Sequence, residues 1–243
     1  MLTKSQIKLI TSLKQKKFRT QHQLFVVEGI KVVEEFLNSE YELDAIFALD
    51  DRFSHYNQKF TLVDSKELAK ISGFSTPNKV LATFKIPKLQ AIDWSSLVVA
   101  LDGVNDPGNL GTIIRLCDWF GIENLACSEE TVDCYNPKVV QASMGSHTRV
   151  NISYLDLKKT LPSASNCIGT FMEGVSVYEQ NLPKTAVIVL GNEANGISKE
   201  IEGLMHTRLS IPRFGKLKQT ESLNVANAAA IILSEFKKNT IET

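Results

Sequence analysis

The sequence has no excess charge and little that points to a metal, a membrane or the cell exterior. Its 27 basic and 27 acidic residues balance to a formal net charge of zero. The four cysteines include no C-x-x-C pair and lie mostly among apolar residues, which predicts free thiols in a reducing compartment and no zinc site. The polar, basic N-terminus predicts no signal peptide, and no apolar run approaches membrane-spanning length. We therefore expect a cytoplasmic protein without a membrane partner.

Two common nucleotide-binding motifs are also absent. Residues 187–198, VIVLGNEANGIS, read as a strand, a glycine turn and the start of a helix, but they do not form G-x-G-x-x-G. No Lys-Ser or Lys-Thr pair follows Gly196, so the P-loop is excluded as well. Glu193 in this turn is either an acid/base residue or an acceptor for backbone N–H groups.

Positive charge is nevertheless clustered in two places. Residues 1–20 carry six basic residues and residues 208–218 carry four, and neither stretch contains an acid. Such clusters fit contacts with an anionic ligand such as nucleic acid. Solvated side chains on exposed faces are the alternative for either cluster taken alone.

Short apolar strands alternate with helices along the chain, which predicts an α/β fold. The second half predicts a parallel sheet with helices on both faces, because strands near 97–101, 124–128, 149–154, 167–171, 186–190 and 208–211 alternate with helices near 112–120, 136–144, 155–160, 196–205 and 222–237. The first half predicts a smaller α/β unit with strands at 24–27, 45–49, 60–63 and 80–84. Its predicted helices are at 5–17, after Gly29 with Val32, Val33, Phe36 and Leu37, and at 65–71. We expect domains at 1–86 and 97–243, with a linker at 87–96.

Three polar loops follow strands of the predicted parallel sheet, at 102–111, 191–196 and 212–221. Ligands of such sheets bind beyond the carboxyl ends of the strands, so these loops predict a pocket. In the first loop, Asn109 and Gly111 lead into a helix that carries Arg115 about one turn in, which suits an anion. A surface arginine in an ion pair is the alternative for Arg115.

The segment 209–236 is predicted to contain a strand that breaks at Pro212, a basic loop and a helix that begins at Ser222. Nine of the eleven residues from 223 to 233 are apolar, which predicts a buried helix. Asn224 and Asn227 lie inside it, and buried amides need hydrogen-bond partners. This pattern favours a ligand site, and the alternative is that Ser222 caps the helix while Asn224 bonds to the backbone.

Together these segments resemble the SpoU/TrmH branch of the SPOUT methyltransferases, a family that shows N-x-G…R, L-G-x-E and I-P…S-L-N-V in this order. The matching stretches are NDPGNLGTIIR (105–115), VIVLGNEANGIS (187–198) and SIPRFG…ESLNVANAAAI (210–231). Residues 13–37, LKQKKFRTQHQLFVVEGIKVVEEFL, resemble the opening of the family's ribosomal-protein-like substrate-binding domain. The resemblance therefore covers nearly the full chain.

The resemblance implies a homodimeric enzyme that moves a methyl group from S-adenosylmethionine to a ribose 2′-hydroxyl in RNA, and a trefoil knot in its C-terminal SPOUT domain. Family members with this N-terminal domain tend to act on large-subunit rRNA, so analogy favours ribosomal RNA over transfer RNA as the substrate.

 The expected target is thus 23S rRNA, chosen by analogy with family members that carry this N-terminal domain, and no DNA partner is expected.

Site residues carry over from the family motifs position by position. Arg115 matches the family's essential arginine at the reacting hydroxyl. The residues expected to bind RNA are Arg115 and, in the N-terminal basic stretch, Lys14, Lys16, Lys17 and Arg19. The expected catalytic residues are Arg115, Asn109, Glu193, Ser222 and Asn224. The residues expected to hold the cofactor are Leu190, Gly191, Asn192, Ile211, Pro212, Ser222 and Leu223, and no metal is expected.

Two departures from the family pattern affect the cofactor loop. Arg213 stands where the family usually has a methionine, and the basic loop 214–221 looks long. A looser match at 170–174 predicts a further pocket wall. His147 lies outside the matched motifs, and we interpret it as structural.

The role of Arg115 is open between two chemistries. The family proposal makes the arginine a base, yet a guanidine pKa above about 12 makes the neutral form costly. Our hypothesis is that Arg115 binds an adjacent phosphate and stabilises negative charge on the hydroxyl oxygen.

Three other functions remain as alternatives. They are a tRNA 2′-O-ribose methyltransferase, a non-catalytic RNA-binding protein with the same fold, and a base methyltransferase of the same superfamily. The complete motif set disfavours the binding protein, since binding alone does not require all five polar residues. The S-L-N-V and N-x-G…R matches disfavour the base methyltransferase.

Overall fold

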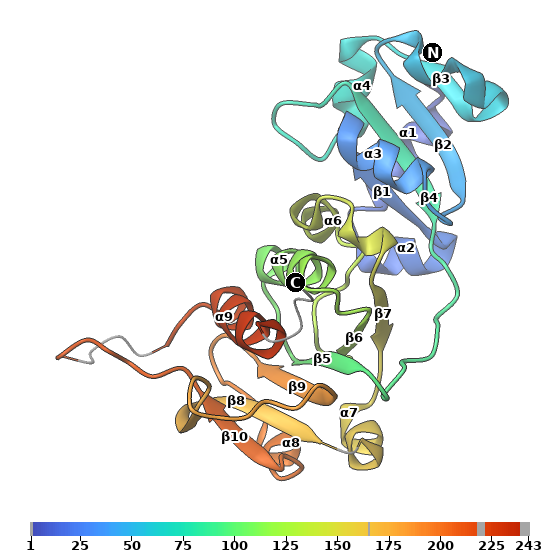
Figure 1. Cartoon of the computed structure of the whole chain (residues 1–243). Coiled ribbons are helices and arrows are strands. Elements are labelled where there is room, and N and C mark those ends of the chain that lie inside the picture. The colour runs from blue at the N-terminus through green and yellow to red at the C-terminus, as the bar shows by residue number, and fades with distance from the viewer. Residues whose placement is uncertain (1, 165, 218–221, 239–243) are drawn as a thin grey trace. The chain divides into compact units, whose positions relative to one another are not determined.

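The computed structural model describes residues 2–164, 166–217 and 222–238. The chain forms two compact units, of which the first comprises Met1–Lys88 with Asp133–Thr148 and the second comprises Leu89–Val132 with Arg149–Thr243. Figure 1 labels the helices and strands of both. The predicted α/β class is confirmed, because the first unit holds a small mixed sheet and the second a parallel sheet. No helix in the described ranges is long and apolar enough to cross a membrane.

The sheet of the first unit has four strands in the order β1-β4-β2-β3, and only the β2–β3 pair is parallel among them. Its strands are β1 (Leu24–Glu28), β2 (Leu43–Ala48), β3 (Phe60–Leu62) and β4 (Val80–Lys85). Its helices are α1 (Lys4–Ser12), α2 (Lys16–His22), α3 (Ile30–Leu37), the 3-10 segment η1 (Asp51–Lys59), α4 (Ser65–Ile71), α6 (Pro137–Ser143) and the 3-10 turn η2 (Ser146–Thr148). The predicted helix at 5–17 is therefore two helices, and η1 was not predicted.

The segment 133–148 belongs to the first unit although it lies far along the chain. Val140 of α6 is buried in the same core cluster as Phe25, Phe36 and Phe84. Gly145 has a φ of +92°, and a Cβ there would come within 2.8 Å of the Glu35 side chain. Apolar burial and this close approach hold the segment against the N-terminal sheet.

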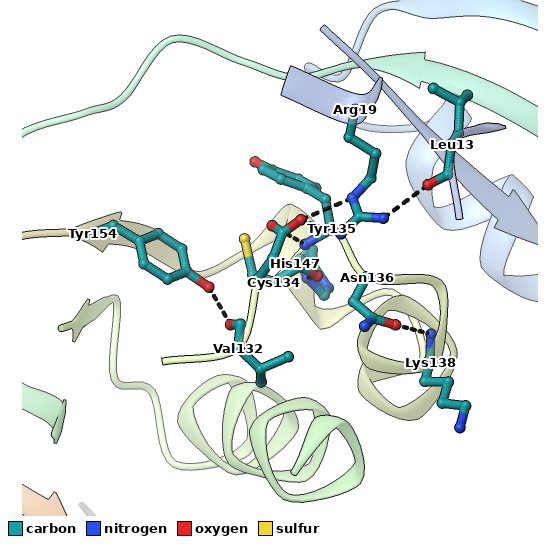
Figure 2. Close-up of polar contacts among 10 residues, drawn as sticks. Leu13, Arg19, Val132, Cys134, Tyr135, Asn136, Lys138, His147 and Tyr154 are labelled. Atoms are coloured by element: carbon teal, nitrogen blue, oxygen red, sulfur yellow. Dashed lines mark hydrogen bonds and ion pairs between the residues drawn. The ribbon is translucent and has the colours of Figure 1, made fainter. Parts of the chain in front are cut away.

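Arg19 anchors the same segment and corrects one prediction (Figure 2). Its side chain is only 2% exposed, and its guanidinium pairs with Asp133, with 2.8 Å from Nε to the carboxylate. A second bond, 2.8 Å long, runs from Nη1 to the carbonyl of Leu13. A buried arginine whose donors are engaged cannot also grip RNA phosphate, so the expected RNA-binding role of Arg19 is wrong for this structure.

The parallel sheet of the second unit has six strands in the order β10-β8-β9-β5-β6-β7. They are β5 (Leu97–Asp102), β6 (Asn124–Cys127), β7 (Asn151–Tyr154), β8 (Cys167–Ser176), β9 (Ala186–Gly191) and β10 (Thr207–Ser210). The helices are α5 (Pro107–Trp119), α7 (Leu157–Thr160), the 3-10 turn η3 (Leu161–Ser163), α8 (Lys199–Glu202) and α9 (Val225–Lys237). Strands β5, β6 and β9 are almost entirely buried, as apolar runs covered on both faces should be.

Helices cover both faces of this sheet, with α5 beside α9 on one face and α7 with α8 on the other (Figure 1). The predicted linker at 87–96 has no helix or strand, yet its later residues are fixed to the sheet. Ser153 donates to the carbonyl of Gln90 at 2.7 Å, and Asn151 donates to that of Ala91 at 2.9 Å. Ile92 is buried in the core. Residues 89–96 therefore pack as part of the second unit.

Three helices of the second unit have clearly different bounds from those predicted. Helix α5 starts five residues before the expected Thr112, because the Asp106 side chain accepts from the Asn109 N–H and Pro107 occupies the first turn. Helix α9 starts at Val225 rather than Ser222, since the Asn224 side chain caps it. Helix α8 covers only Lys199–Glu202 of the predicted range 196–205.

His147 is structural, as interpreted from the sequence. It is 2% exposed, its Nε2 donates to the Cys134 carbonyl at 2.8 Å, and Nδ1 lies 2.7 Å from the Ser143 hydroxyl. Figure 2 shows the ring beside Cys134 in the segment 133–148. Desolvation by burial lowers the pKa of His147 from 6.5 to about 4, against opposing effects of the Cys134 bond and the Asp133 charge.

This burial predicts a pH-dependent stability. The unfolded chain takes up a proton at His147 near its ordinary pKa, whereas the folded chain takes it up only near the lowered one. The contribution is therefore complete above the unfolded pKa and is lost as pH falls toward the folded pKa, by about 3 kcal/mol in all. We expect His147→Gln to flatten the pH dependence of the urea unfolding free energy in that window. An unchanged slope would contradict this assignment.

Candidate functional site

The site lies at the carboxyl ends of strands β5, β9 and β10. The loops that follow these strands are the three that the sequence predicts to form a pocket. Strands β5 and β9 are neighbours, with Asp102 paired to Gly191 at their ends. The turns after them therefore start side by side.

A turn at residues 191–197 depends on two glycines. A Cβ on Gly191 would lie 2.1 Å from the Gly196 carbonyl carbon and 2.2 Å from the Ile197 nitrogen, so no larger residue fits. Gly196 has a φ of +69°, a conformation that favours glycine. Asn192 and Gly196 exchange two backbone hydrogen bonds of 2.9 Å across the turn. The chain thus folds back on itself directly after β9.

Asn192 links this turn to the loop after β5. Its Nδ2 donates to the Gly103 carbonyl at 2.7 Å, and its Oδ1 accepts from the N–H groups of Ala194 and Asn195 at 3.0 Å each. One side chain thereby fixes both the shape of the turn and its distance from β5.

Glu193 makes the second link, with three hydrogen bonds to the loop and first turn of α5. Its carboxylate accepts from the backbone N–H groups of Asn105 and Asp106 at 3.1 Å each. It also accepts from Nδ2 of Asn109 at 2.9 Å. Of the two roles considered from the sequence, this geometry favours the acceptor of backbone bonds.

The protonation state of Glu193 agrees with that role. Partial burial raises its pKa, but the hydrogen bonds from Asn109, Asn105 and Asp106 outweigh burial and leave the pKa below its ordinary value. Hydrogen bonds to the charged form stabilise that form. Glu193 is therefore an ionised acceptor at neutral pH and a weak base.

Asn109 and Asn224 continue the network to helix α9. The Oδ1 of Asn109 accepts from Nδ2 of Asn224 at 2.8 Å. The Oδ1 of Asn224 in turn accepts from the N–H groups of Ala226 and Asn227 at 2.9 and 3.2 Å, which caps α9. A chain of side-chain bonds thus runs from Glu193 through Asn109 to Asn224, over segments far apart in the sequence. It joins three of the five expected catalytic residues.

The two asparagines predicted to be buried in the last helix are both exposed. Asn224 is the cap that precedes the helix and Asn227 is exposed, so neither is a buried amide. Ser222 precedes the cap and is also exposed. Helix α9 buries one side along its length, at Val225, Ala226, Ala229, Ile232, Leu233 and Phe236.

A pocket of about 1460 Å³ opens beside this network. All seven residues that the sequence predicts to hold the cofactor line it: Leu190, Gly191, Asn192, Ile211, Pro212, Ser222 and Leu223. Glu193 lines it too. The residues mix apolar side chains with exposed turn backbone, which fits a small organic ligand with a few polar groups.

The looser sequence match at 170–174 contributes a further wall. Strand β8 pairs with β10 at Gly169↔Arg208 and resumes at Val175↔Leu209, so residues 170–174 leave the ladder. Thr170, Phe171, Met172 and Glu173 of this excursion line the pocket. Arg208 stacks on the Phe171 ring at 3.7 Å from its centroid and pairs with Glu202.

Sequence reasoning missed Phe171, Glu202 and Arg208 as individual pocket residues. The only signal was the loose match at 170–174, because the stack depends on a strand excursion that a short apolar run does not reveal. Arg213, the departure from the family pattern, also lines the pocket. Residues 218–221 of the predicted long loop lie outside the described residues.

Arg115 does not line the pocket and is not joined to the network. It lies on the exposed side of α5, in the second turn after Asn109. Within the described ranges its guanidinium has no hydrogen-bond or ion-pair partner. Such a cation is available to an anion from outside the chain.

The remaining residues predicted to bind RNA lie in and before α2. Lys14, Lys16 and Lys17 are exposed. The Lys14 amine donates to the Ser72 carbonyl at 3.1 Å, and the Lys17 amine lies 5.9 Å from the Phe18 ring centroid. In the described parts of the chain, no three His, Cys, Asp or Glu side chains group as a metal site.

Comparisons with known proteins identify the family of the chain. A model of the SpoU rRNA methylase family matches residues 96–234, and a model of the MRM3-like substrate-binding domain matches residues 4–82. The 23S rRNA (guanosine(2553)-2′-O)-methyltransferase RlmP of Bacillus subtilis is 28% identical over 237 residues, or 91% of this chain and 92% of that protein.

Two solved structures share the fold over the whole chain. A putative RNA methyltransferase of the TrmH family from Porphyromonas gingivalis has a TM-score of 0.89 and 36% identity, over 98% of this chain and 99% of that one. An rRNA methyltransferase from Sinorhizobium meliloti with bound AdoMet has a TM-score of 0.89 and 28% identity, over 100% and 97%. The SpoU model alone matches more than half of the residues. The chain therefore belongs to the SpoU rRNA methylase family.

Proposed function

We propose that this chain methylates a ribose 2′-hydroxyl of 23S rRNA, with Arg115 at the reacting oxygen and with the Glu193–Asn109–Asn224 network fixing the loops around the pocket. The class of enzyme and the cofactor, S-adenosylmethionine, agree with the family and with the relatives described above. The observation that carries the proposal is the pocket, since it is lined by all seven residues expected to hold the cofactor.

The chemistry of the pocket lining suits S-adenosylmethionine. Leu190, Ile211 and Leu223 offer apolar contacts, and Asn192 with the turn backbone offers polar ones. The missing side chain of Gly191 keeps the backbone of the turn close to β9. When bound, the cofactor supplies an electrophilic methyl group on a sulfonium.

The residues of the chain then position the nucleophile. The ribose oxygen would displace the sulfonium sulfur from the methyl carbon, so that S-adenosylhomocysteine is the leaving group. The hydroxyl proton would pass to solvent. Arg115 binds the adjacent phosphate and stabilises negative charge on the oxygen. Glu193 remains ionised and positions Asn109, so it is a positioning residue. Ser222 lies at the pocket and contacts substrate or cofactor there.

Ribosomal RNA is favoured over transfer RNA because the first unit matches a substrate-binding domain and a relative matching nearly the whole chain is a 23S rRNA enzyme. We propose that Lys14, Lys16 and Lys17 contact RNA phosphates. A homodimer, a cytoplasmic location and the trefoil knot belong to the same proposal and follow from the family resemblance.

The test is methyl transfer from labelled S-adenosylmethionine to total RNA of a strain that lacks the gene. We expect label on one ribose of 23S rRNA with the wild type. We expect Arg115→Lys to lower kcat at least about tenfold, because lysine keeps the charge but loses the fork of donors. Cofactor binding should be unchanged. Label in tRNA or on a base would contradict the proposed substrate or reaction. Near-normal turnover of Arg115→Lys would show that catalysis does not require the paired donors of the guanidinium.

The Gly191 turn predicts a sharp effect on cofactor binding. In Gly191→Ala, the new methyl group would overlap the backbone at Gly196 and Ile197, so the turn must move. We expect no measurable binding of S-adenosylmethionine by isothermal titration calorimetry. Gly203→Ala is the matched control, because its Cβ would meet its nearest neighbour at 3.6 Å. Equal affinity for S-adenosylmethionine in the two variants would show that cofactor binding does not depend on the shape of this turn.

Glu193→Gln tests the positioning network. Glutamine keeps one acceptor oxygen, but its NH2 group replaces the other and is itself a donor. This NH2 group would face N–H donors that now bond to the carboxylate. Loss of charge-assisted bonds of this kind costs about 1.5–3 kcal/mol, which corresponds to about 10- to 150-fold in kcat/KM. We expect cofactor affinity to change much less. A rate equal to that of the wild type would show that the network does not support catalysis.

A further inference from the structure

Two aromatic side chains lie exposed at the edge of the parallel sheet, next to the pocket but outside its lining. Strands β8 and β10 form this edge (Figure 1). Tyr178 follows β8, and Phe214 follows β10. Their ring centroids are 6.2 Å apart with 40° between the planes. Tyr178 is 43% exposed and Phe214 is 82% exposed.

The position of this pair is fixed from both strands. Val177, which precedes Tyr178, is buried and donates from its N–H to the Ser210 carbonyl at 2.9 Å. The Ser210 hydroxyl donates to the Gly174 carbonyl at 3.0 Å. Since Phe214 follows Ser210 by four residues, the backbones that carry the two rings are tied together. Tyr178 thus directly follows an anchored residue, and Phe214 lies four residues beyond one.

Charges beside the rings define the kind of ligand. Arg213 and Lys216 flank Phe214 in the sequence, and both line the pocket. Glu173 and Glu179 lie near Tyr178 in the sequence and are exposed, and Glu173 also lines the pocket. A phosphate is attracted to the cations and repelled by the carboxylates, so a polyanion should pass on the Phe214 side. The uncharged face of a base can lie over the rings.

We propose that Tyr178 and Phe214 form a stacking platform for an unpaired RNA base next to the nucleotide that is methylated. This inference rests on the proposed function. Proteins that read single-stranded RNA stack its bases on exposed aromatic side chains and hold its backbone with neighbouring cations. The platform lies outside the pocket lining, on the same segment as Arg213 and Gly215, which line it. A base there is close to the pocket without displacing the cofactor.

The test uses the full chain with two probes. One is 23S rRNA from the strain that lacks the gene, for methyl transfer. The other is a single-stranded oligouridylate of about twelve nucleotides, which is within the usual site size of such proteins. An abasic oligonucleotide of equal length serves as the comparison probe that lacks bases to stack. We expect Phe214→Ala and Tyr178→Ala each to raise the KM for rRNA about tenfold, as expected for one lost base stack. Both should leave kcat and cofactor affinity near the wild-type values.

Two comparisons separate stacking from general damage. Phe214→Tyr should restore the KM, because a phenol ring still stacks. Leu89→Ala is the control for loss of an exposed apolar side chain, since Leu89 is 72% exposed and lies far from this edge in the sequence. It should leave the KM unchanged. The wild type should bind oligouridylate more tightly than the abasic probe, and the alanine variants should lose that preference.

Other results would overturn the platform. Weaker cofactor binding with unchanged RNA affinity would assign the rings to the cofactor site. A changed sedimentation coefficient would assign them to contact with a second copy of the chain. An active wild type with unaffected variants would reject the platform alone, whereas absence of methyl transfer by the wild type would reject the proposed function.

Discussion

The contact between Gly191 and the backbone at Gly196 and Ile197 is the constraint on which the rest of the site depends. Because no side chain separates them, β9 ends in a turn that closes on itself. The closed turn directs Asn192 and Glu193 toward the loop after β5. Their bonds then fix Asn109, and through it Asn224 and the start of α9. A single steric requirement thus orders three segments that are far apart in the sequence.

The network that results is made of fixed acceptors and amide donors rather than of an acid and a base. Glu193 is held ionised by its donors, so it does not take the hydroxyl proton well. His147 is buried, and its pKa of about 4 leaves it neutral, bonded to Ser143 and Cys134. A site of this kind lowers a barrier through position and electrostatics, which a cofactor with its own leaving group permits.

Much of the fold could be predicted from the sequence, because buried parallel strands are short apolar runs bounded by turn residues. The pocket residues followed from motif matches at strand ends. The start of α5 was missed because Asp106 and Pro107 read equally well as loop and as a helix cap. Arg19 was misassigned because its partner, Asp133, lies 114 residues away, and no local pattern reveals that pairing. The excursion of β8 likewise depends on a neighbouring strand, β10.

The polar side chains around the site fall into two groups, according to whether their hydrogen-bond partners lie within the chain. Those that shape the pocket have partners within the chain, as Asn192, Glu193 and Asn224 do. Arg115 is instead exposed and, in the described residues, unpaired. Folding gains little from such a guanidinium, since it keeps its water and its rotamer freedom. The residues that shape the pocket are thus held by contacts within the chain, whereas Arg115 in the described residues is not.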